Sequence, residues 1–202
     1  MIEFNEAEHT YTVDGVSVPN VTSILSPISA YRNFDAKKMD AARQKGVAIH
    51  KMVELSCKGT LDVLGLPGWM KPAYSEWIKF VGISQFQVES SELKVYHPTY
   101  RYAGTMDLYG SIVVAKGKRM SCYIDIKRSL LGGDTIGYQI AAYAEAHRMM
   151  MTKAPISPFK RLALVIREDG HFKLQEYTDT KDYYSFITCL SWQRLCEKHN
   201  IK

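Results

Sequence analysis

The chain has 202 residues, of which 46% are hydrophobic and 23% charged, which suits one globular domain with its own core. No apolar run is long enough to span a membrane, and the polar, acidic start of the chain does not resemble a secretory signal. We therefore expect a soluble, cytoplasmic protein. The net charge of +5 permits binding to nucleic acid but does not indicate it.

The hydrophobic pattern predicts helices around a group of strands, which is typical of an α/β fold with a central mixed β-sheet. We expect a single domain over residues 1–202. An N-terminal hairpin and helices fill residues 1–85, a core fills 86–151, and a C-terminal hairpin and helix fill 160–202. The expected elements are a hairpin (9–18), helices (21–25, 35–57, 71–81), strands (86–96, 102–114, 119–127), a helix (134–151), a hairpin (162–167 with 172–177) and a helix (180–199).

Glycines set several local details of this arrangement. Asp14-Gly15 suits the positive φ angles of a type I′ turn in the first hairpin. Gly46 is expected to divide the helix over residues 35–57 into two pieces. Gly117 fits the third, left-handed position of a three-residue hairpin loop, which would pair Val114 with Lys118.

The most informative part of the sequence is this second hairpin, because each of its strands carries an aspartate. Asp125 and Lys127 are two residues apart on an apolar strand, so their side chains share a face. The three-residue loop would bring Asp107 directly opposite Asp125. Two close carboxylates repel each other unless a cation lies between them, and Mg²⁺ or Mn²⁺ is the natural occupant. A two-residue turn would break this register, and a solvated surface hairpin is the alternative.

Short motifs follow one another along the chain in a fixed order. They are Gly46 with His50 and Glu54, Glu92 in a strand, Gly104-Thr-Met-Asp107, Asp125-Ile-Lys127, and Gln139 with Tyr143. Together they resemble the PD-(D/E)XK nuclease superfamily, in particular its RecB-like exonuclease branch. The opening segment, residues 11–25, resembles the start of phage-encoded members. The resemblance covers residues 9 to about 150 and implies a restriction-endonuclease-like core.

The resemblance also implies a metal site. His50, Asp107 and Asp125 would bind Mg²⁺ or Mn²⁺, and the backbone carbonyl of Ile126 would complete the shell. A histidine nitrogen favours Mn²⁺ relative to an all-oxygen site. The alternative for His50 is a histidine of the hydrophobic core.

Around this site, the resemblance implies that Lys127 is the catalytic lysine. Gln139 and Tyr143 lie four residues apart on one helix face and would position the lysine, the strands or a DNA phosphate. Glu92 would bind a second metal or pair with a basic residue. Glu54 would support the site or form an ordinary salt bridge.

The sequence departs from this family at the residue after the lysine, which is usually Thr or Ser and here is Arg128. Either Ser129 takes that role or Arg128 contacts a phosphate. Some members hold an iron–sulfur cluster through one upstream and three downstream cysteines. Of the four cysteines, Cys57, Cys122, Cys189 and Cys196, only the last two follow the core helix, so we expect no cluster. None forms a CxxC pair, and reduced thiols are expected.

Basic and aromatic side chains before the histidine motif, together with Tyr102 just before Gly104, suit a channel for DNA. They would contact phosphates and stack on bases, whereas a solvated helix face and strand packing are the alternatives. The candidates are Tyr31, Arg32, Phe34, Arg43, Lys45 and Tyr102.

The leading hypothesis is a metal-dependent exonuclease that hydrolyses DNA from its ends, in phage or bacterial recombination, repair or genome processing. Its partner would be single-stranded DNA or duplex DNA with ends, in the cytoplasm of a bacterial host, with no membrane partner. The alternatives are a structure-specific or restriction-type endonuclease and a DNA-binding protein on a catalytically decayed nuclease fold. The sequence leaves open a recombination or single-strand-binding partner protein, and also polarity, strand preference, processivity, oligomeric state and the number of metals.

Overall fold

The computed structural model describes residues 1–5, 8, 10–29, 36–151, 158–167 and 169–201, with the backbone alone over 36–41. Its strands form a five-stranded sheet and a separate three-stranded sheet. The large sheet contains, in spatial order, β4 (Gln87–His97), β5 (Tyr102–Val113), β6 (Arg119–Lys127), β7 (Phe159–Ile166) and β8 (Phe172–Glu176). Neighbours are antiparallel except β6 and β7, which are parallel, so the sheet is mixed.

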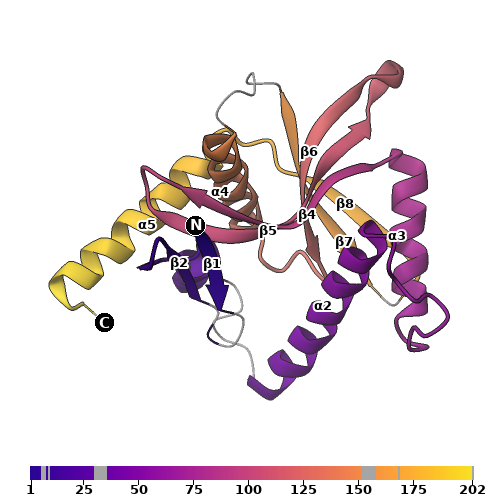
Figure 1. Ribbon diagram of the computed structural model, residues 1–202, viewed down its shortest axis with the longest axis horizontal. Helices are drawn as coiled ribbons and strands as arrows, with labels where there is room; N and C mark the ends of the chain where they lie inside the picture. Colours follow the sequence, from indigo (N-terminus) through magenta and orange to yellow (C-terminus); the bar gives the residue numbers. More distant parts are fainter. Residues whose placement is uncertain (6–7, 9, 30–35, 152–157, 168, 202) are drawn as a thin grey trace.

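Helices flank both sides of this sheet (Figure 1), as the sequence predicted. They are α1 (Val21–Leu25), α2 (Ala36–Cys57), α3 (Lys71–Ser84), α4 (Asp134–Met150) and α5 (Asp182–His199). One hydrophobic core joins α2 and α3 to the sheet, and a second joins α1, α4 and α5 to its other face. Among the described residues, no helix has the length and apolar character needed to cross a membrane.

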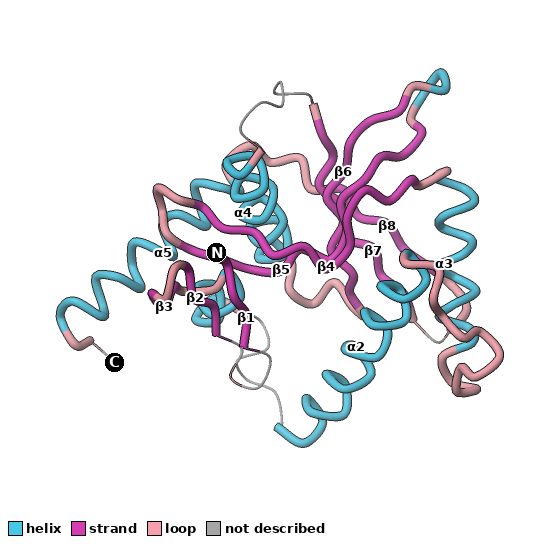
Figure 2. The backbone as a smooth tube through the Cα atoms, in the orientation of Figure 1, coloured by secondary structure: helices cyan, strands magenta, loops and turns pink. Residues whose placement is uncertain are grey.

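The small sheet lies beside the start of β5 (Figure 2) and contains β1 (Ile2–Asn5), β2 (Thr10–Val13) and β3 (Val16–Val18). Asp14 and Gly15 have φ angles of 50° and 77°, and Val13 pairs with Val16, so the two-residue turn is confirmed. The strand β1 was not predicted, although its four residues alternate between apolar and polar side chains.

The helix α2 passes through Gly46 without interruption, so the predicted break is wrong. A glycine within a helix costs only about 1 kcal/mol relative to alanine. Burial of Ile49, Met52 and Val53 in the core on the following turns offsets that cost.

The second hairpin has the predicted register. The β5–β6 pairing runs from Val113 with Arg119 to Leu108 with Ile124. At the base of the loop, the Val114 amide donates a hydrogen bond to the Lys118 carbonyl at 2.7 Å. Gly117 has a φ angle of 70°, as its left-handed position requires.

Candidate metal centre

The large sheet forks at Asp107. The β4–β5 pairing is interrupted between Ser91–Leu108 and Leu93–Met106, which leaves Glu92 opposite Asp107 without regular pairing. The β5–β6 pairing also ends at Leu108, so Asp107 and Asp125 lie just past the end of that ladder. From there β5 continues with β4 away from β6 (Figure 2). Asp107 therefore lies at a gap in the β4–β5 ladder and one residue beyond the end of the β5–β6 ladder.

The side-chain alternation of β5 changes at the same place. Tyr102 and Met106 pack in the core beneath α4, whereas Leu108 and Ile112 pack in the core beneath α2 and α3. Across the interruption, Glu92 has a φ angle of 50°, a left-handed conformation that costs free energy for a residue with a β-carbon. Such backbone outliers concentrate at functional sites, and here the outlier carries one of the acidic side chains.

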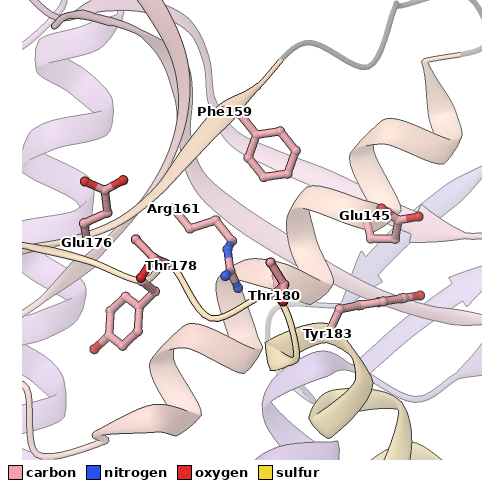
Figure 3. A pocket seen from close by; sticks show the side chains of 9 residues that line it. Glu145, Phe159, Arg161, Glu176, Thr178, Thr180 and Tyr183 are labelled. Carbon is pink, nitrogen blue, oxygen red and sulfur yellow. The ribbon is translucent and has the colours of Figure 1, made fainter. Parts of the chain in front are cut away.

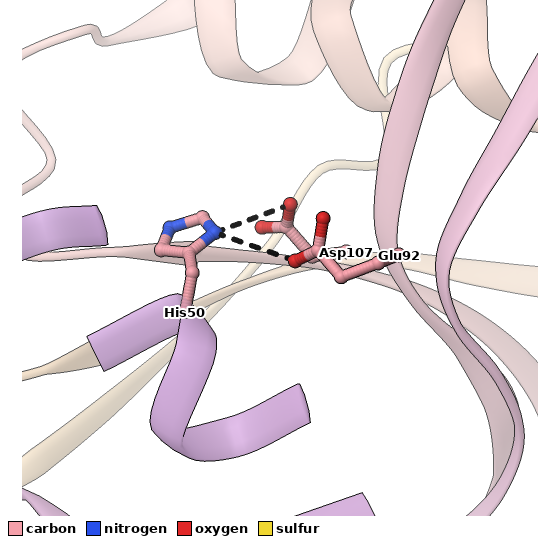
Figure 4. Close-up of side chains that lie close together, drawn as sticks. All are labelled: His50, Glu92 and Asp107. Atoms are coloured by element: carbon pink, nitrogen blue, oxygen red, sulfur yellow. Dashed lines mark ion pairs between the residues drawn. The ribbon is translucent and has the colours of Figure 1, made fainter. Parts of the chain in front are cut away.

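His50 reaches this fork from α2 (Figure 4). Its Nδ1 atom lies 3.4 Å from Asp107 Oδ1 and 3.9 Å from Glu92 Oε1. The three residues each offer one ligand atom, and these atoms lie within 4.8 Å of one another. On the other side of the ring, Nε2 lies 3.0 Å from the Ile126 carbonyl oxygen. A carbonyl that accepts from one ring nitrogen orients the other toward a ligand, as at many metal-binding histidines.

The charges in this cluster depend on one another. Burial disfavours a charged His50, but the Asp107 carboxylate outweighs burial and raises the pKa of His50 to about 9. Burial also acts on Asp107, yet His50 lowers the pKa of that carboxyl below its usual value. The same carboxyl accepts a 2.6 Å hydrogen bond from the Ile126 amide. Burial and the nearby Asp107 raise the pKa of Glu92 to about 7. Without metal, a proton on His50 therefore offsets part of the acidic charge.

The third carboxylate, Asp125, lies with Lys127 on the face of β6 that is directed toward α4. Their atoms Oδ2 and Nζ are 2.6 Å apart. Burial raises the pKa of Asp125 to about 6, against the opposing effect of the Lys127 ammonium. Lys127 donates at 3.2 Å to Gln139 Oε1, and Gln139 Nε2 donates at 3.1 Å to the Tyr143 hydroxyl. The α4 pair predicted from spacing thus contacts the lysine through one continuous chain of hydrogen bonds.

The donor set fits a hard divalent ion. One imidazole nitrogen and two carboxylate oxygens converge, which are donors that Mn²⁺ and Mg²⁺ accept. The side chains of His50 and Glu92 are each 32% exposed, so the cluster is reachable from solvent. Asp125 is close enough to influence the cluster electrostatically but lies with Lys127, outside the group of three.

Three sequence-based candidates have other partners in this structure. The Ile126 carbonyl, expected to bind metal, is occupied by His50 Nε2. Glu54 forms ion pairs with Lys51, at 2.8 Å, and with Lys58, which is the salt-bridge alternative. The Arg128 guanidinium lies 3.4 Å from the Ala42 carbonyl oxygen on α2.

Of the aromatic and basic candidates for DNA contact, the described residues include Tyr102, Arg43 and Lys45. The prediction for Tyr102 is wrong, because its ring is fully buried and its hydroxyl donates to the Ala142 carbonyl at 3.0 Å. Arg43 is exposed on α2, and the Lys45 ammonium lies 5.4 Å from the Trp69 ring centroid. Tyr31, Arg32 and Phe34 lie outside the described residues.

A cavity of about 400 Å³ lies on the far side of α4 (Figure 3). Ala141 and Glu145 line it; Ala141 is two residues from both Gln139 and Tyr143, and Glu145 is two residues from Tyr143, which is about 200° of helix rotation. Its Arg161 is already paired with Asp182 at 2.7 Å. The helix residues that line the cavity therefore lie on a different face of α4 from Gln139 and Tyr143.

Comparison with known proteins assigns no family to this chain: family models give no match, and neither do curated proteins.

Proposed function

We propose that the protein is a metal-dependent nuclease with a restriction-endonuclease-like, PD-(D/E)XK-type core that hydrolyses DNA from its ends. The observation that carries this proposal is the convergence of His50, Glu92 and Asp107 beside the buried Asp125, which is paired with the partly exposed Lys127. The order of the motifs along the sequence supports the same reading. The biological setting would be phage or bacterial recombination, repair or genome processing.

His50, Glu92 and Asp107 would hold Mg²⁺ or Mn²⁺, with Asp125 as a further carboxylate at the same fork. When bound, such an ion polarises a phosphoryl oxygen and lowers the pKa of a coordinated water. His50 would bind such an ion through Nδ1, which must be unprotonated to do so, while Nε2 contacts the Ile126 carbonyl. The divalent charge would then take the place of the Nδ1 proton among the same carboxylates.

Lys127 would stabilise the negative charge that develops on the phosphate in the transition state. Asp125 and Gln139 hold its ammonium from two directions, and Tyr143 in turn holds Gln139. A positioned cation in a partly buried site needs little reorganisation during the reaction, which makes this arrangement suited to charge stabilisation.

Digestion of DNA tests the proposal. End-labelled linear single-stranded and duplex DNA and covalently closed circles are incubated with Mn²⁺ or Mg²⁺ and the wild-type protein. Lys127→Ala tests the site, and Lys160→Ala, which removes a surface ion pair with Glu176, is the matched control. We expect wild type and the control to degrade linear DNA with little base preference, more slowly as salt rises, and to spare circles.

Each other result has a definite meaning. Cleavage of closed circles would replace the exonuclease by an endonuclease with the same metal chemistry. Discrete fragments from linear DNA would have the same meaning. Binding of DNA without metal-dependent cleavage would refute the nuclease and support a decayed fold.

A further inference from the structure

The small N-terminal sheet contacts the strand that carries Asp107. Asn20 forms a parallel bridge with Ala103, and the Ala103 amide donates to the Pro19 carbonyl at 3.0 Å. Tyr11, Val18 and Ala103 form a hydrophobic core of their own. The small sheet is thus fixed to β5 a few residues before the fork.

Tyr11 extends this contact toward the metal cluster. Its hydroxyl lies 2.8 Å from Thr105 Oγ1, and Thr105 is two residues before Asp107 on the same strand. The ring is 6% exposed and packs on Phe4 with a centroid distance of 4.6 Å. Burial raises the pKa of Tyr11, and the Glu92 carboxylate adds to this effect, which places the hydroxyl within electrostatic reach of the cluster.

This contact bears on Asp107 because that residue is itself unpaired in the ladders, at a gap between the paired residues Met106 and Leu108. Its carboxylate also meets both the Ile126 amide and His50. Thr105 is two residues before Asp107 on β5 and is paired with Lys94 on β4. A side-chain hydrogen bond at Thr105 therefore restrains the segment that delivers Asp107.

We infer that Tyr11 is a positioning residue of the metal centre. Through its hydrogen bond to Thr105, Tyr11 holds Asp107 in place for metal binding. The inference rests on the proposed metal centre and assigns the N-terminal sheet to the site. The ring of Tyr11 serves the small hydrophobic core, whereas its hydroxyl serves the strand. Removing the hydroxyl alone separates these two roles.

Calorimetric titration with Mn²⁺ tests this inference on the full-length protein. Tyr11→Phe and Thr105→Val are each expected to weaken Mn²⁺ affinity by about two- to tenfold, the size of one lost hydrogen bond. The double variant should lose no more Mn²⁺ affinity than the single variant that binds Mn²⁺ less tightly, because both changes remove the same hydrogen bond. Thr12→Val is the matched control, since it removes an exposed hydroxyl from the same hairpin, 3.3 Å from Glu3.

Wild-type affinity in Tyr11→Phe would overturn the inference, as would strictly additive losses in the double variant. A loss of thermal stability without a loss of affinity would also overturn it, because the hydroxyl would then be purely structural. Metal affinity is measured without DNA, so an inactive protein that binds Mn²⁺ refutes the nuclease and still decides the role of Tyr11. A wild-type protein that binds no Mn²⁺ overturns both.

Discussion

Replacing Gly104 by alanine should disturb the lysine side of the centre from the opposite strand. A β-carbon at Gly104 would lie 2.4 Å from Cε1 and 3.2 Å from Cδ1 of the Tyr143 ring. Because that ring is only 4% exposed, it must shift by about 1 Å to restore ordinary contact. Overpacking of this kind costs about 1–3 kcal/mol. For a chain of this length, that corresponds to a fall in Tm of about 2–12 °C.

The shift should also reach Lys127, because Tyr143 holds Gln139 and Gln139 holds the lysine. Thermal unfolding and DNA cleavage are therefore measured together, and both should fall in Gly104→Ala. Gly82→Ala is the control. Gly82 is exposed on α3, with no atom within 4 Å of an added β-carbon, and the change should stabilise the protein by up to about 1 kcal/mol. A Gly104→Ala variant that melts and cleaves like wild type would refute this account of the packing.

Other predictions concern the metal and its ligands. Millimolar Mn²⁺ should raise the Tm of the wild type by mass action, and an equal rise in Asp107→Asn would exclude Asp107 as a ligand. Lys127→Ala should keep Mn²⁺ affinity by calorimetry but lose about 100-fold or more in cleavage rate, and near-normal turnover would remove Lys127 from the mechanism. His50→Ala should weaken Mn²⁺ affinity, whereas a variant that misfolds but binds Mn²⁺ normally would make His50 a core residue. Mn²⁺ affinity should rise with pH, because each ligand must lose its proton to bind the ion. Glu92 loses its proton near its pKa of about 7, and His50 loses its proton near its pKa of about 9. A Mn²⁺ affinity that stays constant between pH 6 and 9 would contradict this. Without metal, the His50–Asp107 pair should stabilise the fold fully below pH about 6.5, the ordinary histidine pKa, and lose that contribution as pH rises through about 9. A pH-dependence of unfolding unchanged in His50→Ala would count against it.

The second hairpin shows what the sequence could predict. A single glycine at the left-handed position of a three-residue loop sets the strand register. A shift of the register by one residue would move every side chain of the strand to the other face of the sheet. That register placed Asp107 next to Asp125, and the helical spacing of Gln139 and Tyr143 placed both on the lysine side. These inferences depend on local geometry, which neighbouring residues determine.

The rest depends on tertiary contacts that local pattern does not encode. Nothing in the sequence around Glu92 indicates a left-handed residue at an interrupted ladder, so its place beside His50 was left open. The role of Tyr11 follows from docking of one sheet on another. The sequence could not decide whether Tyr102 stacks on DNA or packs in the core, because aromatic residues occur in both kinds of site. The observed burial of its ring decides for the core.

The way the chain supplies the centre also bears on how the protein folds. The three carboxylates come from one antiparallel meander, β4, β5 and β6, whose pairings are short in sequence and can form early. His50 comes from α2, which is separated from β4 along the chain by α3, and the parallel pairing of β7 with β6 requires the whole α4 crossover. We therefore expect the acidic groups to meet before the imidazolium that offsets them. Repulsion among them should then oppose collapse at that stage, and divalent ions added during refolding should relieve it.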